Sequence, residues 1–197
     1  MSLIRMHRWQ KYNNCEVSRM ISSTKKICII AMGIALFVVL SLCLQVPVFE
    51  NYYLCLGYVV MTVFCYYFGP ISGMVVGGLG VVLYYLLTGG VRGMPGWAIG
   101  NLVIGLFVGL TCKITLKLKN EWMRHVVIGV SIVVSVAIGM LAVKSTIESI
   151  LYAQPMFLRI VKNSYAFVAD VIVMIISLPV CLSLRKVIVK FELHMLL

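Results

Sequence analysis

The chain has 197 residues, of which 62% are hydrophobic and only 12% are charged, and its formal net charge is +11. A soluble domain of this length cannot bury so much apolar surface, so the composition excludes a soluble globular protein. The basic residues lie on the flanks of apolar segments rather than in one stripe with stacking aromatic side chains, which excludes a nucleic-acid-binding protein. We therefore expect an integral membrane protein in which the distribution of charge reports the topology.

The apolar segments are long enough to cross about 30 Å of hydrocarbon as helices, and they lack the period-two alternation of a membrane β-barrel. We expect an all-α membrane protein with six transmembrane helices. Their predicted ranges are 27–46, 52–68, 71–87, 96–116, 126–152 and 165–184. The predicted domains are a basic cytoplasmic N-terminal arm (1–26), a six-helix substrate-binding domain (27–190) and a cytoplasmic tail (191–197).

The N-terminal arm carries six Lys and Arg residues against one acid, Glu16, with Trp9 and Tyr12 between them. Such a segment is expected to lie along anionic lipid headgroups. The first predicted helix holds Ala31 and Ala35 one turn apart on one face. Small residues at this spacing let a partner helix approach closely, in the same molecule or in another.

The stretch 57–110 is rich in glycine and contains two hinges between its apolar segments. The first hinge is Phe68-Gly69-Pro70, and the second is the loop at 88–95. Between them, glycines occupy positions 73, 77, 78 and 80 of the third predicted helix. Glycines at such spacing let helix backbones touch in lipid, so this stretch predicts a tight packing core.

Few ionisable groups lie within the apolar segments, and the predicted topology places them in the outer half of the membrane. Lys144 and Glu148 are four residues apart and share a helix face with Tyr152, and Asp170 lies just over one turn into the sixth helix from its outer end. The other candidate substrate-binding residues are Tyr84, Tyr85, Arg92, Trp97, Asn101 and Asn163. Together they predict an outward-facing cavity that stacks and hydrogen-bonds a flat polar ligand.

Simpler interpretations stay open for the same residues. Lys144 and Glu148 can simply form an ion pair with each other near the membrane interface, without contacting a ligand. Asp170 can serve as a structural partner of Lys144 or Arg92. The tyrosines and Trp97 can form an interfacial aromatic belt without a ligand.

The distribution of Lys and Arg predicts the orientation. Six lie in the N-terminal arm, four lie between the fourth and fifth predicted helices, and three follow the sixth helix. The opposite side has none between the first two helices, one between the third and fourth, and two between the fifth and sixth, plus Lys144. The positive-inside rule therefore places both termini in the cytoplasm.

The sequence holds no HExxH, GxSxG or P-loop motif, and its six acidic residues do not cluster, so no enzyme is predicted. The seven cysteines are scattered, and the three histidines lie at predicted helix ends and tails. We expect no metal site and no cofactor. Without a nucleotide site, uphill transport would need a separate motor or an ion gradient.

The segment FGPISGMVVGGLGVVLYYLLTGG, followed by PGWAIGNLVIGLFVGL, resembles the substrate-binding S components of energy-coupling factor (ECF) vitamin transporters, especially the hydroxymethylpyrimidine-type and related branch. The resemblance implies a subunit of the bacterial plasma membrane that captures a vitamin or precursor outside. It also implies docking on a transmembrane coupling subunit driven by two cytoplasmic ATPases. Ala31 and Ala35 match the AxxxA pattern of the family, which implies the docking face.

The resemblance leaves the substrate open among thiamine precursors, thiamine, pyridoxine-type compounds and riboflavin. Asp170 stands where many relatives have small or apolar residues, so either the ligand carries a basic nitrogen or Asp170 pairs internally. Two alternative functions also stay open. One is a small helical membrane protein with a structural or interaction role and no ligand cavity, and the other is a proton-coupled small-solute carrier.

Overall fold

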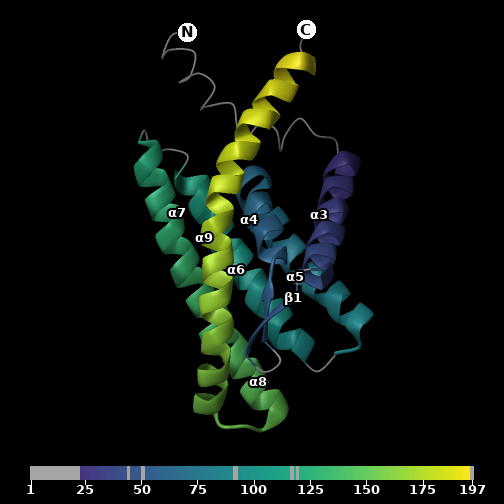
Figure 1. The fold of residues 1–197 in the computed structure, drawn as a ribbon, viewed down its shortest axis with the longest axis vertical. Coiled ribbons are helices and arrows are strands. Elements are labelled where there is room, and N and C mark those ends of the chain that lie inside the picture. The colour runs from purple at the N-terminus through teal and green to yellow at the C-terminus, as the bar shows by residue number, and fades with distance from the viewer. Residues whose placement is uncertain are drawn as a thin grey trace.

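The computed structural model describes residues 23–43, 45–49, 52–90, 93–115, 118 and 120–195. Its elements are α3 (Ser23–Cys43), β1 (Gln45–Phe49), β2 (Tyr52–Cys55), α4 (Gly57–Phe68), α5 (Pro70–Thr88), α6 (Met94–Thr115), α7 (Glu121–Val136), the π-helix η2 (Ala137–Lys144), α8 (Ser145–Tyr152) and α9 (Met156–Met195). Successive long helices run in opposite directions along one bundle, and α3 begins at the end of the bundle where α9 finishes (Figure 1).

Five helical stretches in the described residues are long and apolar enough to cross a membrane. They are Lys26–Cys43, Pro70–Thr88, Met94–Thr115, Trp122–Tyr152 and Met156–Leu184. Helix α4 is also apolar but has only 12 residues, a length of about 18 Å against roughly 30 Å of hydrocarbon. The predicted helical membrane fold is confirmed, whereas the count of six spans and the cytoplasmic termini stay predictions.

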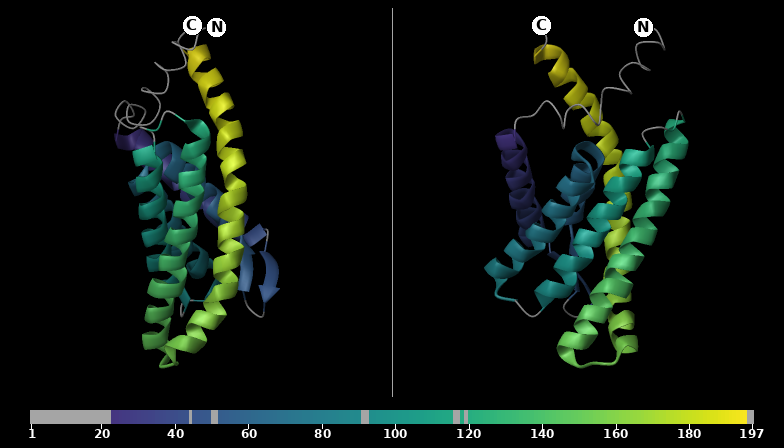
Figure 2. Two further views of the ribbon diagram at one scale, coloured as in Figure 1. Left: turned by 90° about the vertical axis from the view of Figure 1, so that its left-hand side faces the viewer. Right: turned by 180° about the vertical axis from the view of Figure 1, so that it is seen from behind.

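The connection between the first two predicted helices is a β-hairpin, which the sequence prediction missed. Strands β1 and β2 pair antiparallel, with Gln45 opposite Cys55 and Pro47 opposite Tyr53. The predicted range 52–68 is therefore wrong at its beginning, and the first helix ends at Cys43 rather than at 46. This segment is rich in β-branched and aromatic residues, and Pro47 disfavours a continuing helix. The hairpin packs beside α9 (Figure 2).

The predicted connection at 153–164 is also wrong, because α9 already begins at Met156. No Gly or Pro interrupts residues 156–164, so nothing in this segment ends a helix. Helix α9 continues through Pro179 to Met195. Its first two turns therefore carry Arg159 and Asn163 at the same helical spacing as Asp170, which places them on one face.

The fifth predicted helix is continuous but contains the π-helical segment η2. The wider turn is visible in the hydrogen bond that the Ser145 hydroxyl donates to the carbonyl of Met140, five residues earlier, at 3.2 Å. A Cβ atom at Gly100 of α6 would lie only 2.9 Å from the Gly139 carbonyl oxygen, so η2 approaches α6 through glycine. π-Helical turns often occur at functional sites, and this one ends at Lys144.

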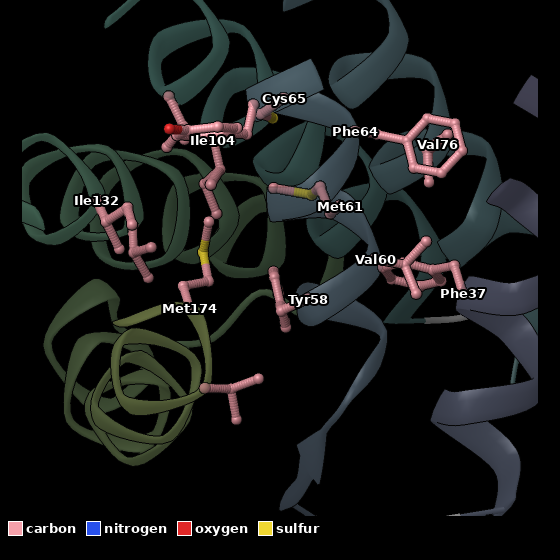
Figure 3. Packing of buried hydrophobic residues seen from close by; sticks show 14 of the residues in the cluster. Phe37, Tyr58, Val60, Met61, Phe64, Cys65, Val76, Ile104, Ile132 and Met174 are labelled. Carbon is pink, nitrogen blue, oxygen red and sulfur yellow. The ribbon is translucent and has the colours of Figure 1, made fainter. Parts of the chain in front are cut away.

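The predicted glycine-rich packing core is confirmed. A Cβ atom at Gly105 would lie 2.7 Å from the backbone of Met74, and one at Gly109 would lie 2.4 Å from the Cα atom of Pro70. Helices α5 and α6 therefore meet backbone to backbone. The apolar core beside them is centred on α4. Buried side chains of α4 lie between those of α3, α6, α7 and α9 (Figure 3).

Candidate functional site

The described residues enclose a cavity of about 620 Å³. Its lining includes residues from α8 and from the beginning of α9, which lie at the end of the bundle opposite the start of α3 (Figure 1). It is lined by residues of α3, β2, α5, α6, η2, α8 and α9 and by the loop that follows α5. Most of the predicted site residues line it, namely Tyr84, Tyr85, Trp97, Lys144, Glu148, Tyr152 and Asp170. Asn101 and Asn163 are fully buried and are not among the lining residues, and Arg92 lies outside the described residues.

One side of the cavity is an aromatic wall, formed by Tyr84 and Tyr85 from the last turns of α5 and Trp97 from the first turn of α6. The rings meet edge to face. Their centroids are 5.7 Å apart for Tyr84 and Trp97 and 5.6 Å apart for Tyr85 and Trp97. Such a cluster offers rigid apolar surface at little entropic cost, which suits contact with a planar ring.

Buried hydrogen bonds connect Trp97 of the aromatic wall to the core of the bundle. Trp97 Nε1 donates to the Tyr58 hydroxyl at 2.8 Å, and that hydroxyl donates to Asn101 Oδ1 at 2.7 Å. Asn101 Nδ2 then donates to the carbonyl of Gly77 at 3.4 Å. Asn101 therefore supports the wall in this arrangement. Tyr58 was missed from the sequence because it stands among apolar residues and resembles any other core aromatic.

The other side of the cavity carries a charged network of Lys144, Glu148 and Arg159. The Glu148 carboxylate lies 3.9 Å from Lys144 Nζ and 3.7 Å from Arg159 Nη1. Asn163 Nδ2 also donates to Glu148 Oε2 at 3.1 Å. The predicted pair of Lys144 and Glu148 is confirmed, but both residues are buried, and Arg159 adds a second cation from α9.

Arg159 and Lys162 line the cavity although they were not predicted as site residues. The sequence prediction places both in a connection between helices, whereas they belong to α9, the helix that carries Asp170. The Arg159 guanidinium lies over the ring of Tyr152 at 4.2 Å, a favourable cation–π contact. The spacing 159, 163, 166 and 170 within a segment without Gly or Pro is the signal that could have found this face.

Ser41 and Cys55 form a small polar corner between α3 and β2 at the cavity. The Ser41 hydroxyl lies 3.1 Å from Cys55 Sγ and donates to the carbonyl of Phe37 at 2.7 Å. Burial raises the pKa of the Cys55 thiol to about 12. Cys55 is therefore a neutral thiol and contributes no charge to the cavity.

Asp170 lies on α9 with only 3% of its surface exposed, and it lines the cavity. Among the described residues no Lys, Arg or His nitrogen lies within the 4 Å of an ion pair with its carboxylate. The predicted direct pair with Lys144 is not formed, although the charge of Lys144 still acts on Asp170. The Tyr58 hydroxyl also acts on the carboxylate.

The charged residues that line the cavity in the described part of the chain are three cations, Lys144, Arg159 and Lys162, and two anions, Glu148 and Asp170. They surround a space that also has a broad aromatic surface. A concave apolar wall with a few convergent polar groups is the arrangement that small-molecule sites commonly have. A helical membrane bundle with such a site fits a substrate-binding subunit of a transporter.

The comparison with known proteins shows the family to which the chain belongs. The family model described as "ECF-type riboflavin transporter, S component" matches residues 21–186. The chain therefore belongs to this family. It is a multi-pass membrane protein and a transporter subunit rather than an enzyme, as the sequence predicted.

Curated proteins and solved structures similar to this chain were also found. Two UPF0397 proteins, from two strains of Streptococcus thermophilus, are each 33% identical over 93 residues, which are 44% of this chain and 49% of the relative. The chain thus spans about half the length of the curated relatives it matches. The crystal structure of the S-component for biotin from an ECF-type ABC transporter shares the fold, with a TM-score of 0.57 and 17% identity. That match covers 84% of this chain and 95% of the other.

The resemblance to ECF S components noted in the sequence is confirmed. The matching model describes a riboflavin transporter component, whereas the sequence resemblance pointed especially to the hydroxymethylpyrimidine-type and related branch.

Proposed function

We propose that this chain is the substrate-capture subunit of an ECF-type importer and that it binds a planar vitamin of the riboflavin class. The observation that carries the proposal is one cavity that combines the aromatic wall with the charged network. A fused ring system would lie against the aromatic wall, and its polar side chain would face the charged network. The volume of about 620 Å³ is in the usual range for a site that encloses a ligand of this size.

The orientation of the cavity follows from the charges outside it. Most Lys and Arg residues precede α3, flank the connection between α6 and α7, or lie in the last part of α9. Residues of α8 and of the beginning of α9 line the cavity, and these segments lie at the opposite end of the bundle (Figure 1). By the positive-inside rule we place both termini in the cytoplasm and the cavity towards the outside, with α4 counted as the sixth span. The arm at 1–26 and the tail at 191–197 would then lie on the cytoplasmic side.

Delivery of the substrate would use the outer face of α3. Ala31 and Ala35 are exposed, whereas Gly33 between them is buried against the ring of Phe64. No other described element covers the Ala31/Ala35 face, so in lipid a helix of a partner can approach it closely. We assign this face to the transmembrane coupling subunit, which would work with two cytoplasmic ATPases.

The experiment is to purify the full chain in detergent, identify any retained ligand by mass spectrometry, and titrate it with riboflavin. Quenching of flavin fluorescence reports binding. We expect a dissociation constant in the micromolar range or below, and binding of thiamine, pyridoxine and biotin at least a hundredfold weaker. Preferred binding of another vitamin would retain the capture function and replace the ligand class. The absence of any vitamin binding at micromolar concentration would overturn the proposal.

A further inference from the structure

We infer that the beginning of α7 binds the headgroup of an anionic phospholipid through Arg124. This position lies at the end of the bundle where α3 begins and α9 finishes, away from the α8 end that lines the cavity (Figure 1). The inference is independent of the cavity ligand. Three observations support it: a buried arginine without a described carboxylate beside it, its level at a helix end, and the exposed apolar surface that follows it along α7.

Arg124 is a buried cation, with only 4% of its surface exposed. Its Nη2 donates to the hydroxyl of Tyr66 on α4, and its Nε has no hydrogen-bond acceptor in the described part of the chain. No described carboxylate lies within the 4 Å of an ion pair with this guanidinium. A neutral hydroxyl supplies no counter-charge, and an uncompensated buried charge is strongly destabilising. We therefore expect an anion beside Arg124.

Arg159 shows the arrangement in which the chain itself supplies the anion. Its Nη1 lies 3.7 Å from the Glu148 carboxylate, and its guanidinium also lies 4.2 Å from the centroid of the Tyr152 ring. Arg124 has a similar ring contact, at 5.5 Å from the centroid of Tyr66. A ring attracts a cation but carries no net charge. The two arginines therefore differ in the acid, and an external phosphate would supply what Arg124 lacks.

The level of Arg124 suits a lipid headgroup. Arg124 lies in the first turn of α7, and Trp122 in the same turn is 76% exposed. Exposed indole rings at helix ends favour the membrane–water interface. Lys113, in the last turn of α6, is also exposed, and the connection at 116–120 brings that helix end to the same level. Basic sites between transmembrane helices near the membrane surface commonly bind anionic headgroups.

The surroundings of Arg124 favour a lipid over a soluble anion or an acidic protein. Val126 and Val127, in the next turn of α7, are exposed apolar side chains. Acyl chains can lie along them while the headgroup reaches Arg124. Helix α7 lies at the opposite edge of the bundle from α3, whose outer face we assign to the coupling subunit (Figures 1 and 2). That assignment leaves α7 facing the bilayer.

The test uses the full chain, delipidated in detergent and without any vitamin. Phosphatidylglycerol, phosphatidylcholine or inorganic phosphate is added, native mass spectrometry measures bound lipid, and the melting temperature is recorded. Phosphatidylcholine is the neutral control, because its choline balances the phosphate charge. We expect phosphatidylglycerol to bind about tenfold more tightly than phosphatidylcholine and to raise the melting temperature by roughly 3–6 °C. Inorganic phosphate should raise it by at most about 1 °C.

Three variants separate the charge of Arg124 from its bond to Tyr66. In Arg124→Gln the cation is lost, so the preference between the two lipids should fall close to one. Tyr66→Phe removes the hydroxyl but leaves the cation, so the preference should persist. An arginine that served only to bond Tyr66 would give no such difference between these variants. Lys113→Gln changes an exposed cation at the same level and should retain most of the preference.

Several outcomes would overturn the inference. Two are equal binding of both lipids to the unmodified chain and a preference that persists in Arg124→Gln. Inorganic phosphate as effective as phosphatidylglycerol would assign Arg124 to a soluble anion instead. Stabilisation that requires Arg124 and appears only with the coupling subunit would replace the lipid by an acidic side chain of that partner. The lipid comparison on the unmodified chain decides the matter even if Arg124→Gln does not fold. A negative result leaves the riboflavin proposal unaffected, because no vitamin is used.

Discussion

The two ends of this molecule are built from different interactions. Towards the end where α4 is followed by α5, glycines let α5 and α6 touch, and buried apolar side chains fill the remaining space. Near the other end, aromatic rings and buried charges surround a cavity. The first region leaves no room for a side chain at Gly105 or Gly109, whereas the second encloses a cavity with polar lining residues. The contrast indicates that one region fixes the fold and the other is available for a ligand.

The largest effect is expected from Gly109→Leu in the packed region. A Cβ atom there would lie 2.4 Å from the Cα atom of Pro70, and because this neighbour is backbone, no side-chain rotation relieves the clash. We expect a loss of stability of about 3 kcal/mol or more and little folded protein. The measurement is the yield and the melting temperature in detergent. Gly129→Ala is the matched control, because nothing lies within 4 Å of the added atom. Similar melting temperatures for the two variants would contradict the packing argument.

The second prediction distinguishes ligand binding by this chain from uptake by the complete transporter. Ala31→Trp combined with Ala35→Trp adds two large rings to the exposed face of α3. If this face docks the coupling subunit, uptake by cells with the complete transporter should fall to background, while ligand binding to the purified chain stays unchanged. Val130→Trp, on an exposed site of α7, is the control and should retain uptake. A loss of binding in the double variant would mean that the face is packed within the chain.

Within the cavity, Glu148→Gln should have an intermediate effect. This change leaves Lys144 and Arg159 without their shared counter-charge, and both side chains are largely buried. Uncompensated buried charge is strongly destabilising, so the melting temperature should drop by roughly 5–10 °C and the affinity by about tenfold or more. Thr146→Ala, an exposed neighbour on α8, should change neither quantity. An unchanged melting temperature for Glu148→Gln would show that the charged network contributes nothing to stability.

The sequence predicted the packed region better than the cavity. The prediction of close helix contact used the spacing of glycines 73, 77, 78 and 80 in an apolar segment, which is a local signal. Lys144, Glu148 and Asp170 could be proposed because charge is rare in such segments. Arg159 was missed, since a few polar residues after Pro155 resemble a loop unless the absence of a helix breaker is considered. The π-helical turn of η2 has no comparable sequence signal, because it depends on how η2 packs against α6.

The smallest effect is expected from Trp97→Phe, which tests whether the two regions are mechanically linked. This variant keeps an aromatic ring beside Tyr84 and Tyr85 but removes the N–H group that donates to Tyr58 at 2.8 Å. Because a single neutral hydrogen bond contributes about 1 kcal/mol, the affinity should fall only two- to fivefold.

Trp97→Ala also removes the ring surface, so it should weaken binding by at least tenfold. A Trp97→Phe variant as weak as Trp97→Ala would mean that the bond to Tyr58 matters more than the ring. Ligand affinity would then depend chiefly on the buried hydrogen bonds that connect Trp97 through Tyr58 and Asn101 to the carbonyl of Gly77 on α5. A graded response would instead mean that the aromatic surface contacts the ligand directly and that the packed region supplies only its position.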